Sequence, residues 1–150
     1  MQSFFHCAPL PLGAGSVVQP GNWGRVLRLY AWNPNQIVLN AWREALLEQA
    51  HDIYAPQKPS RLAATFALPS QQEAVEFRNK HATTSLIYEV EPVSLNPNTH
   101  EGDYELAIAG FSGQYFQELL DFPRRYWTIP PAANREILFD CGLRVIAQVP

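Results

Sequence analysis

The chain has 150 residues, of which 47% are hydrophobic and 17% are charged, and this balance is typical of one globular domain. Its formal net charge of −3 gives no broad positive field for nucleic acid or an anionic membrane. No apolar run approaches the roughly 20 residues of a membrane span, and no basic, apolar leader opens the sequence, so we expect a cytoplasmic protein without membrane association.

The two cysteines lie at opposite ends of the chain. Cys7 and Cys141 form no CxxC motif, and neither has a histidine at metal-ligand spacing. We therefore expect two reduced, buried thiols and no bound metal.

The first elements in chain order are short. Residues 3–8 predict a strand that ends at Pro9, and residues 12–22 predict a loop rich in glycine and proline. Residues 23–32 mix apolar and basic side chains, a pattern compatible with a strand or a short helix.

Two helices and a strand follow. Apolar residues at three- and four-residue spacing predict a helix over 40–54, with Asn40 as its N-cap. Residues 60–68 predict a strand. Ser70 and Glu73 have the spacing of a capping box, which predicts a second helix after Ser70.

The second half of the chain contains more strands. Residues 83–93 alternate apolar and polar side chains, which predicts a strand, whereas Glu101-Gly102-Asp103 is typical of a turn. Residues 104–108 are compatible with a strand end or a short helix, and residues 113–120 predict a helix. The last predicted strands are 136–139 and 143–148, joined as a hairpin by a tight turn at Cys141-Gly142. The sequence therefore predicts an α+β domain.

Three residues on separate strands suit chemistry on NAD: His6, Phe66 and Glu136. Breaking the bond between nicotinamide and ribose develops positive charge on the sugar carbon, which a carboxylate can stabilise. A neutral imidazole can hold a ribose hydroxyl, and an aromatic ring can pack on nicotinamide. The plainer alternative is a strand histidine, a core phenylalanine and a solvated glutamate.

The order of four motifs resembles the ADP-ribosyltransferase fold of the His-Tyr-Glu class. The motifs are Phe4-Phe5-His6-Cys7-Ala8, Thr65-Phe66-Ala67, Leu86 to Pro92, and Asn134 to Phe139 followed by Arg144-Val145-Ile146. The third motif is similar to the central strand of small bacterial rifampin ADP-ribosyltransferases, and the fourth to the glutamate strand of poly(ADP-ribose) polymerases. Residues 58–62 and 100–103 also resemble an uncharacterised bacterial family of this layout.

The resemblance implies a split, mainly antiparallel sheet with flanking helices over residues 1–150, and NAD as a substrate. His6 would hold the ribose, while Cys7, Thr65 and Phe66 would line the nicotinamide pocket. Cys7 stands where the class has glycine, and Thr65 where it has tyrosine. The catalytic acid is Glu136 by analogy with the polymerases, or Asp103 by analogy with the rifampin enzymes.

Arginines near these strands are candidates for holding the pyrophosphate of NAD, because a guanidinium binds phosphate bidentately. Arg61 is the first candidate, with a surface ion pair as the alternative, and Arg25 and Arg28 are weaker ones. Glu89 and Glu91 share a face of the strand over 83–93 and fit a solvated face better than a catalytic pair.

The resemblance implies an enzyme that transfers ADP-ribose to a protein or nucleic acid, or hydrolyses NAD, such as a bacterial toxin, effector or modifying enzyme. An antitoxin or immunity protein is a candidate partner. Cys7 and Thr65 favour an alternative, a catalytically inactive binding module of the same fold. A small ribonuclease-like toxin using His6 or His100 is a third alternative, which the absence of a basic cluster disfavours.

Overall fold

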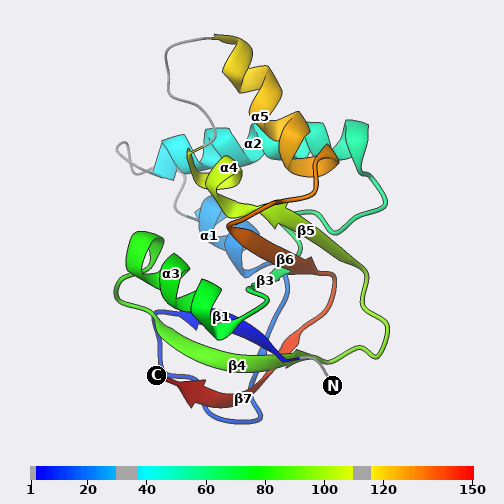
Figure 1. Cartoon of the computed structure of the whole chain (residues 1–150). Coiled ribbons are helices and arrows are strands. Elements are labelled where there is room, and N and C mark those ends of the chain that lie inside the picture. The colour runs from blue at the N-terminus through cyan, green and yellow to red at the C-terminus, as the bar shows by residue number, and fades with distance from the viewer. Residues whose placement is uncertain (1–2, 30–36, 110–115) are drawn as a thin grey trace.

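The computed structural model describes residues 3–29, 37–109 and 116–150, which form helices above and beside two β-sheets (Figure 1). The helices in this part of the chain are α1 (Asn22–Leu29), α2 (Ile37–Tyr54), α3 (Gln71–His81), α4 (Tyr104–Ala109) and α5 (Phe116–Thr128). The strands there are β1 (Phe4–Ala8), β2 (Val17–Val18), β3 (Thr65–Ala67), β4 (Leu86–Pro92), β5 (Thr99–Asp103), β6 (Arg135–Phe139) and β7 (Leu143–Val149). The predicted α+β class is confirmed.

All strand pairs among the described residues are antiparallel, and they divide into two sheets. One sheet has the order β1-β4-β7-β2 and the other has the order β3-β6-β5. The sheets meet where Phe5 of β1 exchanges backbone hydrogen bonds of 2.9 and 2.7 Å with Leu68, just after β3. The predicted split antiparallel sheet is therefore confirmed, with β1 and β3 at the split.

Within the described ranges, three apolar clusters fill the space between these layers. Leu138 of β6 packs with residues of α2 and α5, including Leu47 and Tyr126, so this cluster joins the three-stranded sheet to the helices. Phe139 on the same strand packs with Tyr88 between the two sheets. A third cluster lies beneath α3, which covers β1 and β4 (Figure 1).

Local sequence chemistry explains the start of α3. Ser70 has extended φ and ψ of −146° and 158°, and its hydroxyl accepts a hydrogen bond of 3.2 Å from the amide of Glu73. The predicted N-cap is confirmed.

Helices α2 and α5 depart from the predicted bounds. Helix α2 begins at Ile37, so the predicted N-cap at Asn40 is wrong, and the Asn40 side chain instead accepts a hydrogen bond of 2.8 Å from Arg43. Helix α5 continues to Thr128 through Pro123, because Pro123 and Trp127 are buried and tertiary packing compensates for the missing amide. The first positions predicted for this helix, 113–115, and the end of the stretch 23–32 lie outside the described residues.

Other predictions were wrong about strands. The predicted strand over 60–68 is reduced to β3, and residues 61–63 form a turn. The turn predicted at Glu101-Gly102-Asp103 is part of β5. The predicted terminal hairpin does not form, because β6 and β7 belong to different sheets. Gly142, which lies between the two strands in the sequence, packs against Val17 and Val18.

Candidate functional site

A buried ion cluster centres on Arg61, in the turn before β3. Its Nε donates to Glu44 Oε2 at 2.9 Å, and its Nη2 donates to Glu44 Oε1 at 3.0 Å. Its Nη1 donates to the carboxylate of Glu136 and to the hydroxyl of Tyr126, the latter at 2.8 Å. The guanidinium carbon lies 5.0 Å from the ring centroids of both Phe66 and Tyr126, so two aromatic faces enclose the charge.

The charges of this cluster are nearly balanced despite their burial. The side chains of Arg61, Glu44 and Glu136 are 6%, 2% and 10% exposed. Burial lowers the pKa of Arg61, but Glu136 and Glu44 raise it well above its ordinary value, so the guanidinium stays charged. Arg43 lies within electrostatic range of Glu44 and Arg61 and contributes a second positive charge.

Two helices and two strands bring this cluster together. Glu44 comes from α2, Tyr126 from α5 and Glu136 from the second position of β6. On β5, the residue paired with Glu136 is Gly102, where an added Cβ would lie 2.5 Å from the Tyr126 ring. The missing side chain therefore lets Tyr126 lie over the sheet and donate a hydrogen bond of 2.8 Å to Glu136 Oε1.

The two carboxylates are engaged differently. Both oxygens of Glu44 accept hydrogen bonds from Arg61. In Glu136 both donors, Arg61 and Tyr126, bind the same oxygen, Oε1, and Oε2 has no partner among the described residues. Glu136 is therefore a carboxylate with one anchored oxygen and one oxygen that no described residue engages.

His6 lies at the split between the sheets. Its Nδ1 lies 2.7 Å from the backbone oxygen of Phe66, on β3. Since a carbonyl oxygen can only accept, Nδ1 carries the proton. Burial lowers the pKa of His6, an effect that the Phe66 carbonyl partly offsets, so the ring is neutral at pH 7. Its Nε2 is therefore an acceptor, and it has no partner within the part of the chain that the structure describes.

The remaining predicted residues have structural contacts. The Thr65 hydroxyl donates to the backbone oxygen of Cys141 at 2.8 Å. The Cys7 thiol points to the Ala74 carbonyl at 3.7 Å, and burial raises its pKa to about 11. Asp103 accepts a hydrogen bond of 2.9 Å from the amide of Glu105 and so stabilises the first turn of α4.

The structure links four of the predicted residues in one chain of contacts. His6 binds the Phe66 carbonyl, the Phe66 ring lies against Arg61, and Arg61 binds Glu136. No hydrogen bond or ion pair joins His6 and Glu136, two residues that the structure describes. Asp103 lies opposite Arg135 in the register of β5 and β6, and Arg135 projects from the opposite face of β6 to Glu136. Sequence reasoning missed Glu44 and the role of Tyr126. Neither carries a motif that could have identified it.

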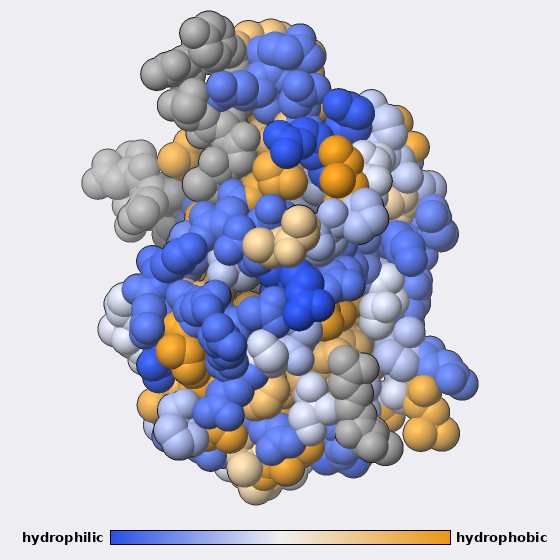
Figure 2. All heavy atoms as spheres, viewed as in Figure 1, coloured by the Kyte–Doolittle hydropathy of each residue, from blue (hydrophilic) through white to orange (hydrophobic). Residues whose placement is uncertain are grey.

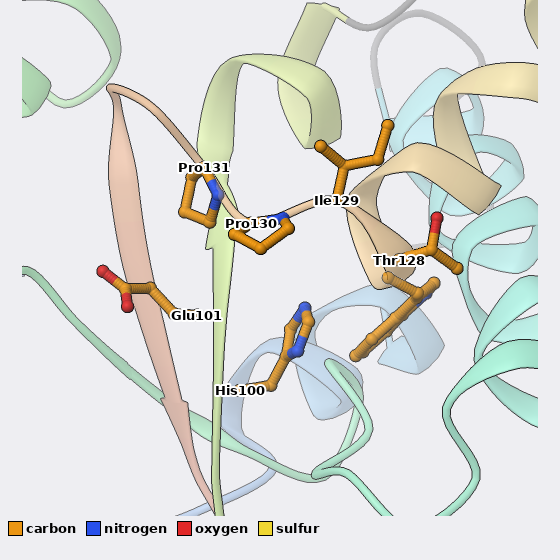
Figure 3. Close-up of a pocket in the computed structure, with 7 residues that line it drawn as sticks. His100, Glu101, Thr128, Ile129, Pro130 and Pro131 are labelled. Carbon is orange, nitrogen blue, oxygen red and sulfur yellow. The ribbon is translucent and has the colours of Figure 1, made fainter.

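A shallow pocket of about 270 Å³ lies where β5 meets the end of α5. The ring of His100 points toward Pro130 and Ile129, whereas the Glu101 side chain points away to the other side of the strand (Figure 3). Nε2 of His100 donates to the Tyr126 carbonyl at 3.2 Å, and burial lowers its pKa to about 4. A neutral imidazole at pH 7 is a poor general acid, which weighs against the ribonuclease alternative with His100.

A second pocket, of about 390 Å³, lies between α1 and the turn that carries Arg61. It is lined by Pro20, Gly21, Arg25, Arg28, Glu48, Ser60, Leu62 and Ala63. The two arginines are exposed, in contrast to Arg61.

One group in the described ranges has metal-ligand spacing: Glu48, His51 and Asp52, whose ligand atoms lie within 4.8 Å of one another. These atoms already have protein partners. Ser60 donates to both oxygens of Glu48, and His51 Nε2 lies 2.9 Å from the Lys58 carbonyl. The group therefore gives no independent indication of a cation.

The face shown in Figure 2 is largely hydrophilic, with hydrophobic residues in separate spots. None of the described helices has the length and apolar character that crossing a membrane requires.

Residues 24–150 match the family model described as "Protein of unknown function (DUF2441)". Because this match covers most of the chain, the protein belongs to the DUF2441 family. No curated protein matches the sequence.

Proposed function

We propose that this protein is an NAD-dependent enzyme of the ADP-ribosyltransferase type, which transfers ADP-ribose to a macromolecule or hydrolyses NAD. The observation that carries the proposal is the state of Glu136. Its carboxylate is held and oriented by Arg61 and Tyr126 through one oxygen, while its second oxygen has no protein partner among the described residues.

Such a carboxylate suits cleavage of the nicotinamide–ribose bond. As that bond breaks, its electron pair leaves with nicotinamide and positive charge develops on the sugar carbon. Oε2 of Glu136 stabilises this charge and orients the attacking hydroxyl or water. A preoriented charge is effective because it needs no reorganisation during the reaction. The Glu136 side chain is only 10% exposed, so NAD reaches it only when the covering side chains move.

His6 supplies the second function of the site. Because Nδ1 donates to the Phe66 carbonyl, Nε2 presents a lone pair that accepts a hydrogen bond from a ribose hydroxyl. The split sheet supports this reading, since β1 and β3 diverge at His6 and Phe66 after pairing at Phe5 and Leu68.

A binding module without catalysis is the second candidate. The specific observation in its favour is Thr65, which stands where the His-Tyr-Glu class has tyrosine. Its hydroxyl donates a hydrogen bond to the Cys141 carbonyl. Such a module would bind NAD and leave it intact.

The test incubates the protein with NAD and a cell lysate that supplies acceptors, and measures both nicotinamide release and labelled ADP-ribose transfer. We expect release by the wild type, loss of release in Glu136→Gln, and retention in Asp103→Asn. Loss in Asp103→Asn alone would assign the acid to Asp103. Binding of NAD without release would favour the binding module, and neither binding nor release would reject both candidates.

A further inference from the structure

The predicted pyrophosphate ligand Arg61 cannot serve that role in this structure. Its guanidinium is enclosed by two aromatic rings and bound to Glu44, Glu136 and Tyr126, and the side chain is 6% exposed. Binding a phosphate there would break the buried ion cluster. A phosphate-bearing substrate therefore needs another cation.

The pocket beside α1 offers two such cations. Arg25 and Arg28 are three residues apart on α1, so they share one face of the helix, and both line the pocket together with Ser60. Arg25 binds only the neutral side-chain amide of Asn22, and Arg28 has no ion-pair partner among the described residues.

The charge of this pocket is positive in a chain whose net charge is negative. Its lining contains two arginines and one carboxylate, Glu48, whose oxygens both accept hydrogen bonds from Ser60, at 2.7 and 2.8 Å. Two adjacent guanidinium groups match a diphosphate, because each can form parallel hydrogen bonds to phosphate oxygens.

Close packing fixes α1 against the segment that leads to the site. The Gly21 amide donates to the Ala64 carbonyl at 3.1 Å, and a Cβ on Gly24 would lie 2.2 Å from the Leu62 oxygen. Only glycine at position 24 allows this approach. The arginines are therefore presented from a firmly placed helix.

The pocket is also close to His6. Ala63 lines the pocket, and three residues later the Phe66 carbonyl binds the His6 ring. Three residues span at most about 11 Å even when fully extended. The edge of the pocket at Ala63 therefore lies within about 11 Å, along the backbone, of the carbonyl that holds the imidazole.

We propose that Arg25 and Arg28 bind the pyrophosphate of the dinucleotide substrate in the pocket between α1 and the turn at residues 60–63. The identity of the ligand as a dinucleotide rests on the proposed function. The positive charge and the lining of the pocket do not depend on whether the protein catalyses a reaction.

Calorimetric titration with inorganic pyrophosphate, ADP-ribose and NAD tests the assignment in the wild type, Arg25→Ala, Arg28→Ala and the double variant. Arg124→Ala is the matched control, because Arg124 is an exposed helical arginine far along the chain, on α5. We expect each pocket variant to bind ADP-ribose about tenfold or more weakly, which is the effect of losing a charged hydrogen-bonding group. The control should change the Kd by less than about twofold. Urea unfolding of each variant checks that the fold is intact.

The outcomes separate this assignment from the enzyme proposal. If ADP-ribose binding depends on the two arginines but no nicotinamide is released, the pyrophosphate site is supported and the proposed enzymatic activity is rejected. If NAD is cleaved and the double variant has an unchanged KM and unchanged ADP-ribose binding, the assignment is overturned and catalysis stands. Absence of wild-type binding to both pyrophosphate and ADP-ribose would also overturn it.

Discussion

Replacing Arg61 by methionine tests whether the buried cluster is held by charge. Methionine keeps the length and the apolar stem, but it leaves Glu44 and Glu136 without their shared cation at 2% and 10% side-chain exposure. Removing one partner of a buried pair costs about 3–5 kcal/mol, because the remaining charge is left uncompensated. With a urea m-value of about 2 kcal/mol/M, the unfolding midpoint should fall by about 2 M.

Urea unfolding followed by tryptophan fluorescence measures this change, since Trp127 is buried and its ring centroid lies 4.9 Å from that of Tyr126 in the ion cluster. Arg144→Met is the control: Arg144 pairs with Glu91 at 3.1 Å on the surface, and losing that pair should cost less than about 1 kcal/mol. Adding Glu44→Gln and Glu136→Gln to Arg61→Met should restore part of the stability. A loss below about 1 kcal/mol in Arg61→Met, or no recovery in the triple variant, would refute the electrostatic reasoning.

Three further predictions concern single groups. Gly24→Ala should lower the free energy of unfolding by about 1–3 kcal/mol, because its Cβ would lie 2.2 Å from the Leu62 oxygen, whereas Gly13→Ala, with no atom within 4 Å, should not destabilise the protein. Cys7, with a pKa raised to about 11, should react with iodoacetamide at pH 8 about a hundredfold more slowly than a cysteine peptide, as measured by mass spectrometry. The pKa of His100 is about 4 in the folded state and about 6.5 in the unfolded chain, so the unfolded chain binds the proton first as the pH falls. The free energy of unfolding should therefore fall by about 3 kcal/mol as the pH drops from about 6.5 to about 4. His100→Gln should remove this loss.

Each of these has a contrary result. Equal stability of the two glycine variants would mean that α1 does not approach the turn closely. Alkylation of Cys7 at the rate of a free peptide would mean that the thiol is accessible and not desolvated. An identical pH dependence in the wild type and His100→Gln would show that this imidazole does not control acid stability.

Local signals were sufficient for the parts of the fold that depend on neighbouring residues. Strand β1, the capped helix α3 and strand β4 follow from alternation and from the Ser70–Glu73 spacing. Strand β5 did not, because Gly102 and Asp103 favour a turn when considered alone. Gly102 is required there by the ring of Tyr126, a contact between residues 24 positions apart.

The sequence predicted only part of the site, again because some of its contacts join residues far apart in the chain. Sequence order suggested His6, Phe66, Arg61 and Glu136, and the structure joins them by successive contacts. The ionic role of Arg61 depends on Glu44, which only the packing of α2 against the sheet brings within reach. The turn residues Cys141-Gly142 predicted a hairpin between the last two strands. Instead β6 pairs with β3 and β5, whereas β7 pairs with β4 and β2, so the two strands belong to different sheets.

The most direct test of the proposed chemistry compares nicotinamide release by Glu136→Gln and Glu44→Gln with that of the wild type. Each variant removes one carboxylate charge from the same cluster, but only Glu136 has an oxygen left for the substrate. With the loss of stability measured in both, we predict that Glu136→Gln lowers the rate by at least about a hundredfold and that folded Glu44→Gln stays within about tenfold of the wild type. Equal losses in the two variants, or full activity in Glu136→Gln, would contradict the assignment of Glu136 as the catalytic acid.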